Sequence, residues 1–312
     1  MKILITGACG HIGSYFIENL YKIKKVKKAI LVDSLTSNRF NSLFNTNTKN
    51  KIEFHLKDLN DARSLDQFKN ISIVFHFASM TNAEKSFGKE KEMFSNNLNC
   101  LETVIKFCKR TGAKLVHLSS TSVYGTQDLE VDENCSENQL QPQSPYAKTK
   151  IKEEKYVSKL QKSKALKSIH CRFGTIYGAS PGMRFHTAVN KFCWQAVMGQ
   201  PITVWKTAYD QYRPYLDLQD ASAAIVFIIK NDLFDGRIYN VLSDNLTVRN
   251  VVETIKHHIP SLEVVFVENA IMNQLSYKVL DERFRSKGFK SSGNLKRGIS
   301  ETIALLKNSN HI

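Results

Sequence analysis

The sequence has no long hydrophobic run, and this absence argues against one class of protein. None of its 312 residues lies in an apolar stretch near the ~18 residues that a membrane-spanning helix needs. We therefore expect no membrane span. The first predicted strand begins at residue 2, which leaves no room for a signal peptide. We expect a cytoplasmic protein.

Cysteine pairs at metal-binding or redox spacing are also missing. The six cysteines form no Cys-x-x-Cys pair and stand at positions 9, 100, 108, 135, 171 and 193. Such scatter is typical of reduced thiols in a cytosolic protein. His257 and His258 are adjacent on a polar helix end, without a third ligand nearby in the sequence. We predict no metal site.

Acidic residues are scarce relative to basic ones, which raises the question of a nucleic-acid partner. The chain has 29 Asp and Glu against 44 Lys and Arg, a net charge of +15. The lysines fall mostly in polar helix faces and loops, such as 22–28 and 148–167. No basic-aromatic stripe and no nucleic-acid-binding motif is present. We expect no nucleic-acid partner.

The first residues carry a phosphate-binding pattern. Ile3 to Ile5 form an apolar run typical of a buried parallel strand, and glycines follow at Gly7, Gly10 and Gly13. Glycine permits a tight turn, lets the backbone approach a pyrophosphate, and lets the next helix pack closely. A helix predicted over 12–21 would point its N-terminal amides at those phosphates.

A carboxylate follows at the spacing expected for a dinucleotide site. Asp33 ends the apolar run 29–32 and lies twenty residues after Gly13. This is the place for the side chain that binds the ribose 2′-hydroxyl. Because a carboxylate there repels a 2′-phosphate, the sequence predicts NAD rather than NADP.

Predicted strands and helices alternate over the first half of the chain. Strands are predicted over 52–56, 71–78 and 115–119, and helices over 62–68, 92–111 and 146–161. This alternation predicts an α/β fold with a doubly wound parallel sheet, the Rossmann fold. Ligands of such sheets bind beyond the carboxyl ends of the strands. The sequence places Gly7, Asp33, Asp58, Ala78 and Ser120 at those ends.

After residue 168 the pattern becomes mixed. Strands are predicted over 169–173, 202–205, 215–218, 238–242 and 264–267, and helices over 188–198, 220–230, 248–257 and 295–307. We predict an NAD-binding domain over 1–168 and a smaller, mixed α/β, mainly substrate-binding domain over 169–312. Residues from about 215 to 242 are expected to return to the first domain.

Three side chains fit hydride chemistry at a sugar carbon. Ser120 ends a predicted strand, and Tyr146 and Lys150 share one face of a predicted helix. A Tyr-x-x-x-Lys pair alone is weak evidence, because exposed helices often carry one. Its place after the glycine turn and Asp33 favours a catalytic role.

Five more segments carry a family signature, namely 6–13, 58–59, 76–79, 172–178 and 213–220. With Ser120, Tyr146 and Lys150, they resemble the extended short-chain dehydrogenases/reductases. Within that family the resemblance is to the NAD-dependent nucleotide-sugar epimerase/dehydratase group, and to UDP-glucose 4-epimerase-like members in particular. It covers nearly the whole chain.

The resemblance implies residue roles. Tyr146 would take a proton from a sugar hydroxyl, Lys150 would favour its phenolate and bind the nicotinamide ribose, and Ser120 would hydrogen-bond the reacting oxygen. The implied cofactor contacts are Gly7, Gly10, His11, Ile12, Gly13, Asp33, Asp58, Leu59, Phe77, Ala78, Ser79, Asn97, Tyr146 and Lys150. The implied substrate contacts are Thr81, Ser120, Thr175, Asn190, Arg213 and Arg283, with Arg285 as an alternative to Arg283.

The family also implies partners. A nucleoside-diphosphate sugar is the expected substrate, a UDP-sugar above others. A homodimer is expected through the helices near 92–111 and 146–161.

Absent residues narrow the reaction. Sugar 4,6-dehydratases of this family place Asp-Glu after the active-site Thr, whereas Thr121-Ser122 stands here. Family decarboxylases tend to carry Glu where Ser122 stands, and family reductases usually take NADPH. We therefore expect C4 epimerisation through a transient keto-sugar. Gly174-Thr175 replaces the Phe-Asn of many galactose-type epimerases, and Thr81 replaces a Lys of some, so the sugar stays open.

Two alternatives remain. One is an NAD-dependent nucleotide-sugar oxidoreductase, dehydratase or decarboxylase on the same scaffold. The other is a non-catalytic NAD-binding regulatory protein.

Overall fold

A seven-stranded parallel sheet organises the molecule. The computed structural model describes residues 1–44, 46, 51–82, 86–125, 130–268 and 276–308. Neighbouring strands of the sheet, from one edge to the other, are β11 (Ile238–Val241), β7 (Ser168–Phe173), β5 (Lys114–Ser120), β4 (Ile73–His76), β1 (Lys2–Thr6), β2 (Lys28–Asp33) and β3 (Lys51–Leu56). Every neighbouring pair is parallel. The predicted doubly wound Rossmann sheet is confirmed.

Helices cover both faces of this sheet. Alternate side chains of a strand point to opposite faces, so Ile3 and Ile5 pack in one core with α1 (His11–Glu18) and α5 (Leu218–Asn231). Leu4 packs on the other face with α2 (Glu90–Thr111) and α3 (Pro145–Lys162). The inner strands β1, β2, β4, β5 and β7 are buried on both sides, as their continuous apolar runs predict, whereas the edge strand β3 is half-buried and ends in the exposed Leu56.

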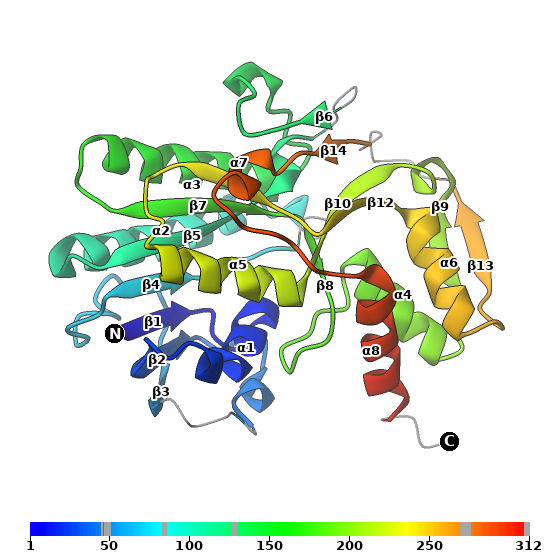
Figure 1. Ribbon diagram of the computed structural model, residues 1–312, viewed down its shortest axis with the longest axis horizontal. Coiled ribbons are helices and arrows are strands. Elements are labelled where there is room, and N and C mark those ends of the chain that lie inside the picture. Colours follow the sequence, from blue (N-terminus) through cyan, green and yellow to red (C-terminus); the bar gives the residue numbers. More distant parts are fainter. Residues whose placement is uncertain (45, 47–50, 83–85, 126–129, 269–275, 309–312) are drawn as a thin grey trace.

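A smaller unit lies beside the sheet. Figure 1 groups α4 (Ala188–Val197), α6 (Val248–His258) and α8 (Leu295–Lys307) at the right of the view. They share a core with β9 (Ile202–Trp205), which pairs in parallel with β13 (Val264–Val267). A three-stranded sheet contains β8 (Thr175–Tyr177), β10 (Tyr212–Asp217) and β12 (Asp244–Thr247). A two-stranded sheet pairs β6 (Glu130–Val131) with β14 (Lys278–Val279), and α7 (Glu282–Arg285) follows.

The predicted helix over 62–68 is wrong. Consecutive turns replace it, in which Ser64 N–H donates to the Asp61 carbonyl (3.0 Å) and Phe68 N–H donates to the Leu65 carbonyl (3.2 Å). The Asp61 carboxylate also accepts from Arg63 N–H (2.9 Å). Asp side chains that bond nearby backbone amides favour turns over helices.

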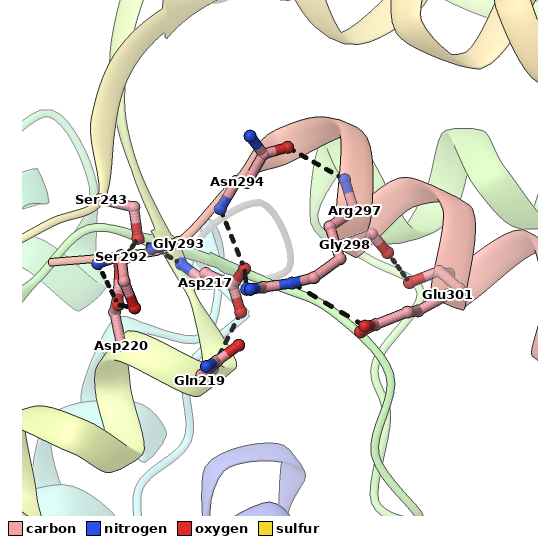
Figure 2. Close-up of polar contacts among 11 residues, drawn as sticks. Asp217, Gln219, Asp220, Ser243, Ser292, Gly293, Asn294, Arg297, Gly298 and Glu301 are labelled. Atoms are coloured by element: carbon pink, nitrogen blue, oxygen red, sulfur yellow. Dashed lines mark hydrogen bonds and ion pairs between the residues drawn. The ribbon is translucent and has the colours of Figure 1, made fainter.

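Residues far apart in the sequence meet at the start of α5, as Figure 2 shows. Asp217 caps the helix by accepting from Gln219 N–H (2.8 Å) and also pairs with Arg297 Nη2 (2.7 Å). Asp220 is fully buried and accepts from the backbone amides of Ser292 and Gly293, both at 2.8 Å. These two carboxylates fasten the segment 292–297 to the large sheet's helix layer.

Candidate active site

The glycine turn between β1 and α1 is built so that only glycine fits. Gly7 has φ +66°, and a Cβ there would lie 2.5 Å from the Ala78 backbone nitrogen. A Cβ on Gly13 would lie 2.5 Å from the Gly7 carbonyl oxygen. No side chain therefore covers the backbone of the turn, and the backbone amides of the first turn of α1 lie next to it.

A cavity of about 570 Å³ opens over this turn. Its lining includes the predicted positions Gly7, Gly10, Asp33, Asp58, Leu59, Phe77, Ala78, Ser79 and Thr81. They come from the carboxyl ends of β1, β2, β3 and β4 and the loops after them. A bare glycine turn, a carboxylate and apolar walls in one cleft fit an adenine dinucleotide.

Two backbone amides hold the Asp33 carboxylate at the end of β2. One oxygen accepts from Cys9 N–H (2.9 Å) and the other from Leu35 N–H (2.8 Å). A carboxylate oxygen can accept more than one hydrogen bond. Asp33 therefore faces the cavity in a fixed orientation and retains capacity for a ribose hydroxyl.

Asn97 shapes the loop after β4 rather than lining the cavity. It is buried in α2, and its amide oxygen accepts from Met80 N–H (2.8 Å). Its amide nitrogen donates to the Met80 carbonyl (3.0 Å). The Asn97 side chain thus pairs with both the N–H and the carbonyl of Met80, as a neighbouring backbone would, and this fixes the loop that carries Ser79 and Thr81.

His11 and Asn190 tie the glycine turn to the smaller unit. His11 Nδ1 lies 2.7 Å from Ser180 Oγ, and Nε2 lies 3.3 Å from Asn190 Nδ2. Burial lowers the pKa of His11 to about 3, and the nearby Arg184 cation adds to the effect. His11 therefore stays neutral. The Asn190 side chain is fully buried and also bonds the Gly178 backbone.

Arg184 is a cavity residue that the sequence did not reveal. Its Nη1 bonds Thr81 Oγ1, and its Nη2 lies 3.9 Å from where a Cβ on Gly10 would be. Within the described part of the chain, Arg184 Nε has no hydrogen-bond partner and no carboxylate pairs with the guanidinium. Burial lowers its pKa, and neighbouring Arg39, also in the cavity lining, lowers it further. Two cations thus meet over the glycine turn.

The three predicted catalytic residues come from two adjoining elements. Ser120 ends β5 and its Oγ accepts from Ser122 N–H (3.2 Å). Tyr146 is the second residue of α3, which Ser144 caps by accepting from Ala147 N–H (3.2 Å). Lys150 lies one turn later, with Nζ 5.8 Å from the centre of the Tyr146 ring. Because α3 packs against the turn 121–123 that follows Ser120, Tyr146 and Lys150 lie near the end of β5. None of the three is among the residues that line the cavity, but Tyr146 is an electrostatic neighbour of Arg184, which does line it.

Other predicted substrate residues lie outside the cavity lining. Thr175 begins β8, where it pairs with Tyr215 of β10. Arg213, in β10, donates to Gln211 Oε1 (3.4 Å). Arg283 donates to the Ile238 carbonyl (2.9 Å) and bonds Asn134, while Arg285 pairs with Asp281 (2.8 Å). Their contact with a substrate stays a prediction.

The described residues contain neither a metal cluster nor a membrane-spanning helix. No group of three or more His, Cys, Asp or Glu in the described residues could hold a metal ion. None of the described helices is both long and apolar enough to cross a membrane.

Comparison with known proteins gives relatives of two kinds. A trifunctional UDP-glucose 4,6-dehydratase/UDP-4-keto-6-deoxy-D-glucose 3,5-epimerase/UDP-4-keto-L-rhamnose-reductase of Arabidopsis thaliana is 27% identical over 97% of this chain. The chain spans only 46% of that enzyme's length. An uncharacterized UDP-glucose epimerase of Bacillus subtilis is 29% identical over 82% of this chain and 81% of its own.

A solved structure shows the same fold. The dTDP-glucose 4,6-dehydratase of Streptomyces venezuelae, with NAD and TYD bound, superimposes with a TM-score of 0.87 at 22% identity, covering 99% of this chain and 98% of that one. The model of the NAD dependent epimerase/dehydratase family matches residues 3–241. The predicted resemblance and the predicted NAD cofactor are both confirmed at the level of the family. With this match over most of its length, the chain belongs to the NAD dependent epimerase/dehydratase family.

Proposed function

We propose that the protein is an NAD-dependent nucleotide-sugar epimerase that inverts C4 through a transient keto-sugar. One observation carries the proposal. Tyr146 and Lys150 lie on the part of α3 that packs against the turn after Ser120, and Tyr146 is an electrostatic neighbour of Arg184 in the cavity lining. The two residues after Ser120 are the uncharged Thr121 and Ser122. The site thus has the groups for reversible hydride transfer and lacks the acid and base pair of the family's dehydratases.

The cavity residues would hold the cofactor. The glycine turn and the start of α1 would bind the pyrophosphate, with Arg184 above it, and Asp33 would bind the adenosine ribose. When bound, NAD supplies a hydride acceptor and donor for the sugar carbon. The charge of Arg184 has no partner among the described carboxylates, so a phosphate would satisfy it.

The chain's own residues would move the proton. Tyr146 accepts the proton of the C4 hydroxyl as C4 is oxidised, and returns it when C4 is reduced from the other face. Ser120 donates a hydrogen bond to the reacting oxygen. Lys150 favours the phenolate of Tyr146 by its charge. No net oxidant or reductant is consumed.

The neighbours of Ser120 disfavour elimination of water. Thr121 is buried and its hydroxyl donates to the Phe173 carbonyl (3.4 Å). Ser122 Oγ is buried and unpartnered among the described residues. Elimination needs a general acid and a general base, and neither hydroxyl is suited to those roles at neutral pH. Similarity to dehydratases therefore does not extend to these two positions.

The substrate and assembly are part of the proposal. The names of the relatives give UDP- and dTDP-sugars, so we infer a nucleoside-diphosphate sugar, with UDP-sugars to be tried first. We also infer a homodimer through α2 and α3. Sedimentation that shows only monomer at micromolar concentration would contradict the dimer.

Proton NMR of the purified protein with a panel of UDP-, GDP-, dTDP- and CDP-sugars tests the function, with no NAD added. We expect the C4 epimer of one sugar to form, and none to form with Tyr146→Phe. A keto or decarboxylated product that requires added NAD would instead indicate another reaction on this scaffold. No conversion by either protein, with or without NAD, would favour the regulatory alternative.

A further inference from the structure

A buried carboxylate lies directly beneath the predicted catalytic lysine. Glu153 Oε2 accepts from Lys150 Nζ at 2.7 Å and lies 3.0 Å from His117 Nε2. The side chains of Lys150, Glu153 and His117 are 5%, 1% and 0% exposed. We propose that Glu153 is a positioning residue that fixes the Lys150 ammonium and keeps it charged for the chemistry at Tyr146. This inference rests on the proposed function.

The geometry of α3 places Glu153, and not its neighbour Glu154, beside Lys150. Glu153 follows Lys150 by three residues, so both side chains share one face of α3. Glu154 is turned away and forms a two-point ion pair with Arg172, at 2.9 Å and 2.7 Å. Two adjacent buried carboxylates thus have separate partners. Only the carboxylate of Glu153 forms a hydrogen bond with Lys150.

Two histidines in neighbouring strands complete the arrangement. His117 of β5 and His170 of β7 are in register, and their Nδ1 atoms lie 3.3 Å apart. His170 Nε2 has no partner among the described residues. The assignment that leaves no buried N–H unpaired has His170 Nδ1–H donating to His117 Nδ1, and His117 Nε2–H donating to Glu153.

This tautomer chain leaves His170 neutral. Burial holds the pKa of His170 well below its ordinary value, which agrees with the assignment. Lys150 is the ammonium paired with the Glu153 carboxylate. An ammonium has three N–H donors, so the bond to Glu153 leaves two for the ribose and the Tyr146 side of the site.

The balance of charge and burial sets the direction of the expected effect. Burial is the largest single effect on Lys150 and lowers its pKa, but the Glu153 carboxylate, with smaller contributions from Tyr146 and Glu154, leaves the pKa raised. Burial would raise the pKa of Glu153, but Lys150 and His117 hold it below its ordinary value. Without the Glu153 carboxylate the effect of burial would be less opposed, and Lys150 would lose its proton at a lower pH.

Other titratable groups also face this pair. They are Tyr146 and Glu154 on α3, His76 on β4, Cys100 on α2, and Arg172 on β7. Burial lowers the pKa of His76 and raises that of Cys100, so both are neutral near pH 7. Glu154 is already paired with Arg172. None of these groups can replace the Glu153 carboxylate at Lys150.

The test follows the charge of Lys150 directly. Carbon NMR of protein labelled at lysine Cε reports the protonation of each lysine amine. The resonance that is missing in Lys150→Met is assigned to Lys150. In Glu153→Gln we expect this resonance to titrate at least about one pH unit lower than in the wild type. The alkaline limb of the kcat profile for epimerisation should move in the same direction.

Two more variants serve as controls. Glu153→Asp keeps the charge and should titrate close to the wild type. Glu154→Gln makes the same chemical change one residue away and should shift Lys150 much less. An unchanged Lys150 titration in Glu153→Gln, or an equal shift in Glu154→Gln, would overturn the proposal. If Glu153→Gln fails to fold, Glu153→Asp decides the question. A Lys150 resonance that titrates in Glu153→Asp at the same pH as that of the exposed neighbour Lys148 would overturn the proposal as well.

The NMR measurement needs no turnover. A wild-type protein that converts no sugar would count against the proposed epimerase, yet the titration of Lys150 would still decide the role of Glu153. The two proposals can therefore fail separately.

Discussion

Replacing Arg184 with Gln should weaken the binding of NAD without unfolding the protein. The guanidinium lies over the glycine turn, where its Nη2 is 3.9 Å from the position of a Cβ on Gly10. Its guanidinium bonds Thr81 Oγ1, and no carboxylate of the described residues pairs with it. Gln keeps a polar, shorter side chain and removes the charge.

The size of the effect can be worked out from this environment. A hydrogen bond to a charged group contributes about 1.5–3 kcal/mol. If Arg184 makes one such bond to the pyrophosphate, its loss raises the Kd for NAD by about 10- to 150-fold. The folded protein should lose little stability, because no carboxylate of the described residues forms an ion pair with Arg184, and Arg39 partly repels it.

Calorimetric titration of cofactor-free protein with NAD and with adenosine provides the assay. Adenosine lacks phosphates, so its affinity should not change in Arg184→Gln. Arg63→Gln, at an exposed position, serves as the control for loss of one positive charge. The reasoning is refuted if the Kd for NAD rises less than about 3-fold, or if adenosine binding weakens as much as NAD binding.

Tyr146→Phe should bind NAD like the wild type but lose roughly 10²–10⁴-fold in epimerisation rate, because the proton acceptor is gone. Calorimetry measures the binding of NAD and NMR measures the rate, and an unchanged rate would contradict the role of Tyr146. Arg172→Met should lower the free energy of unfolding by about 3–5 kcal/mol in denaturant titration, because the Glu154 carboxylate stays buried without its partner. The loss should shrink when Glu154→Gln is added, and a larger loss in the double variant would argue against this cause. Acidification should lower the free energy of unfolding between about pH 6.5 and pH 3, because unfolded histidines gain a proton there while burial holds the pKa of His11 and His76 at about 3 in the folded protein. The folded state binds fewer protons in that window, so stability rises with pH, by up to ~1.4 kcal/mol per unit for each histidine; His76→Gln should reduce the slope in denaturant titrations at several pH values.

Local apolar spacing predicted the larger elements well. The predicted strands 202–205 and 264–267 and the helix 295–307 coincide with β9, β13 and α8. β9 and α8 bury one face along their own length, which the period of their apolar residues predicts. β13 has no such face, because its residues are half-buried or exposed, and its apolar run alone predicted it. By contrast, β8, β12 and β14 have two to four residues each and arise from pairing between distant segments. No local signal marks them.

The candidate site was predictable where spacing alone defines it. Gly7, Asp33 and Ser120 stand at the carboxyl ends of strands of the parallel sheet, and Gly7 and Asp33 line one cavity there. Arg184 was not predictable, because its loop has no period. Its position depends on tertiary contacts, such as Gly182 N–H donating to Ser14 Oγ (2.9 Å).

Glu153 was missed for a different reason. A Lys followed by Glu three residues later is common on exposed helices, and the sequence does not say which face of α3 is buried. Only the packing of α3 against β5, where His117 lies, makes this pair an interior one. The same spacing on another face would be worth little.

The fastening of residues 292–297 to α5 has a consequence for the order in which the chain folds during synthesis. Asp220 leaves the ribosome 72 residues before its partner Ser292, and Asp217 leaves 80 residues before Arg297. Until those partners emerge, the first turn of α5 has two carboxylates that cannot be buried at acceptable cost. The sheet up to β5 can form early, but the layer made by α5 cannot close until the last helix is being translated. A ribosome stalled before residue 292 should therefore display a nascent chain in which α5 is open to protease while α2 and α3 are protected.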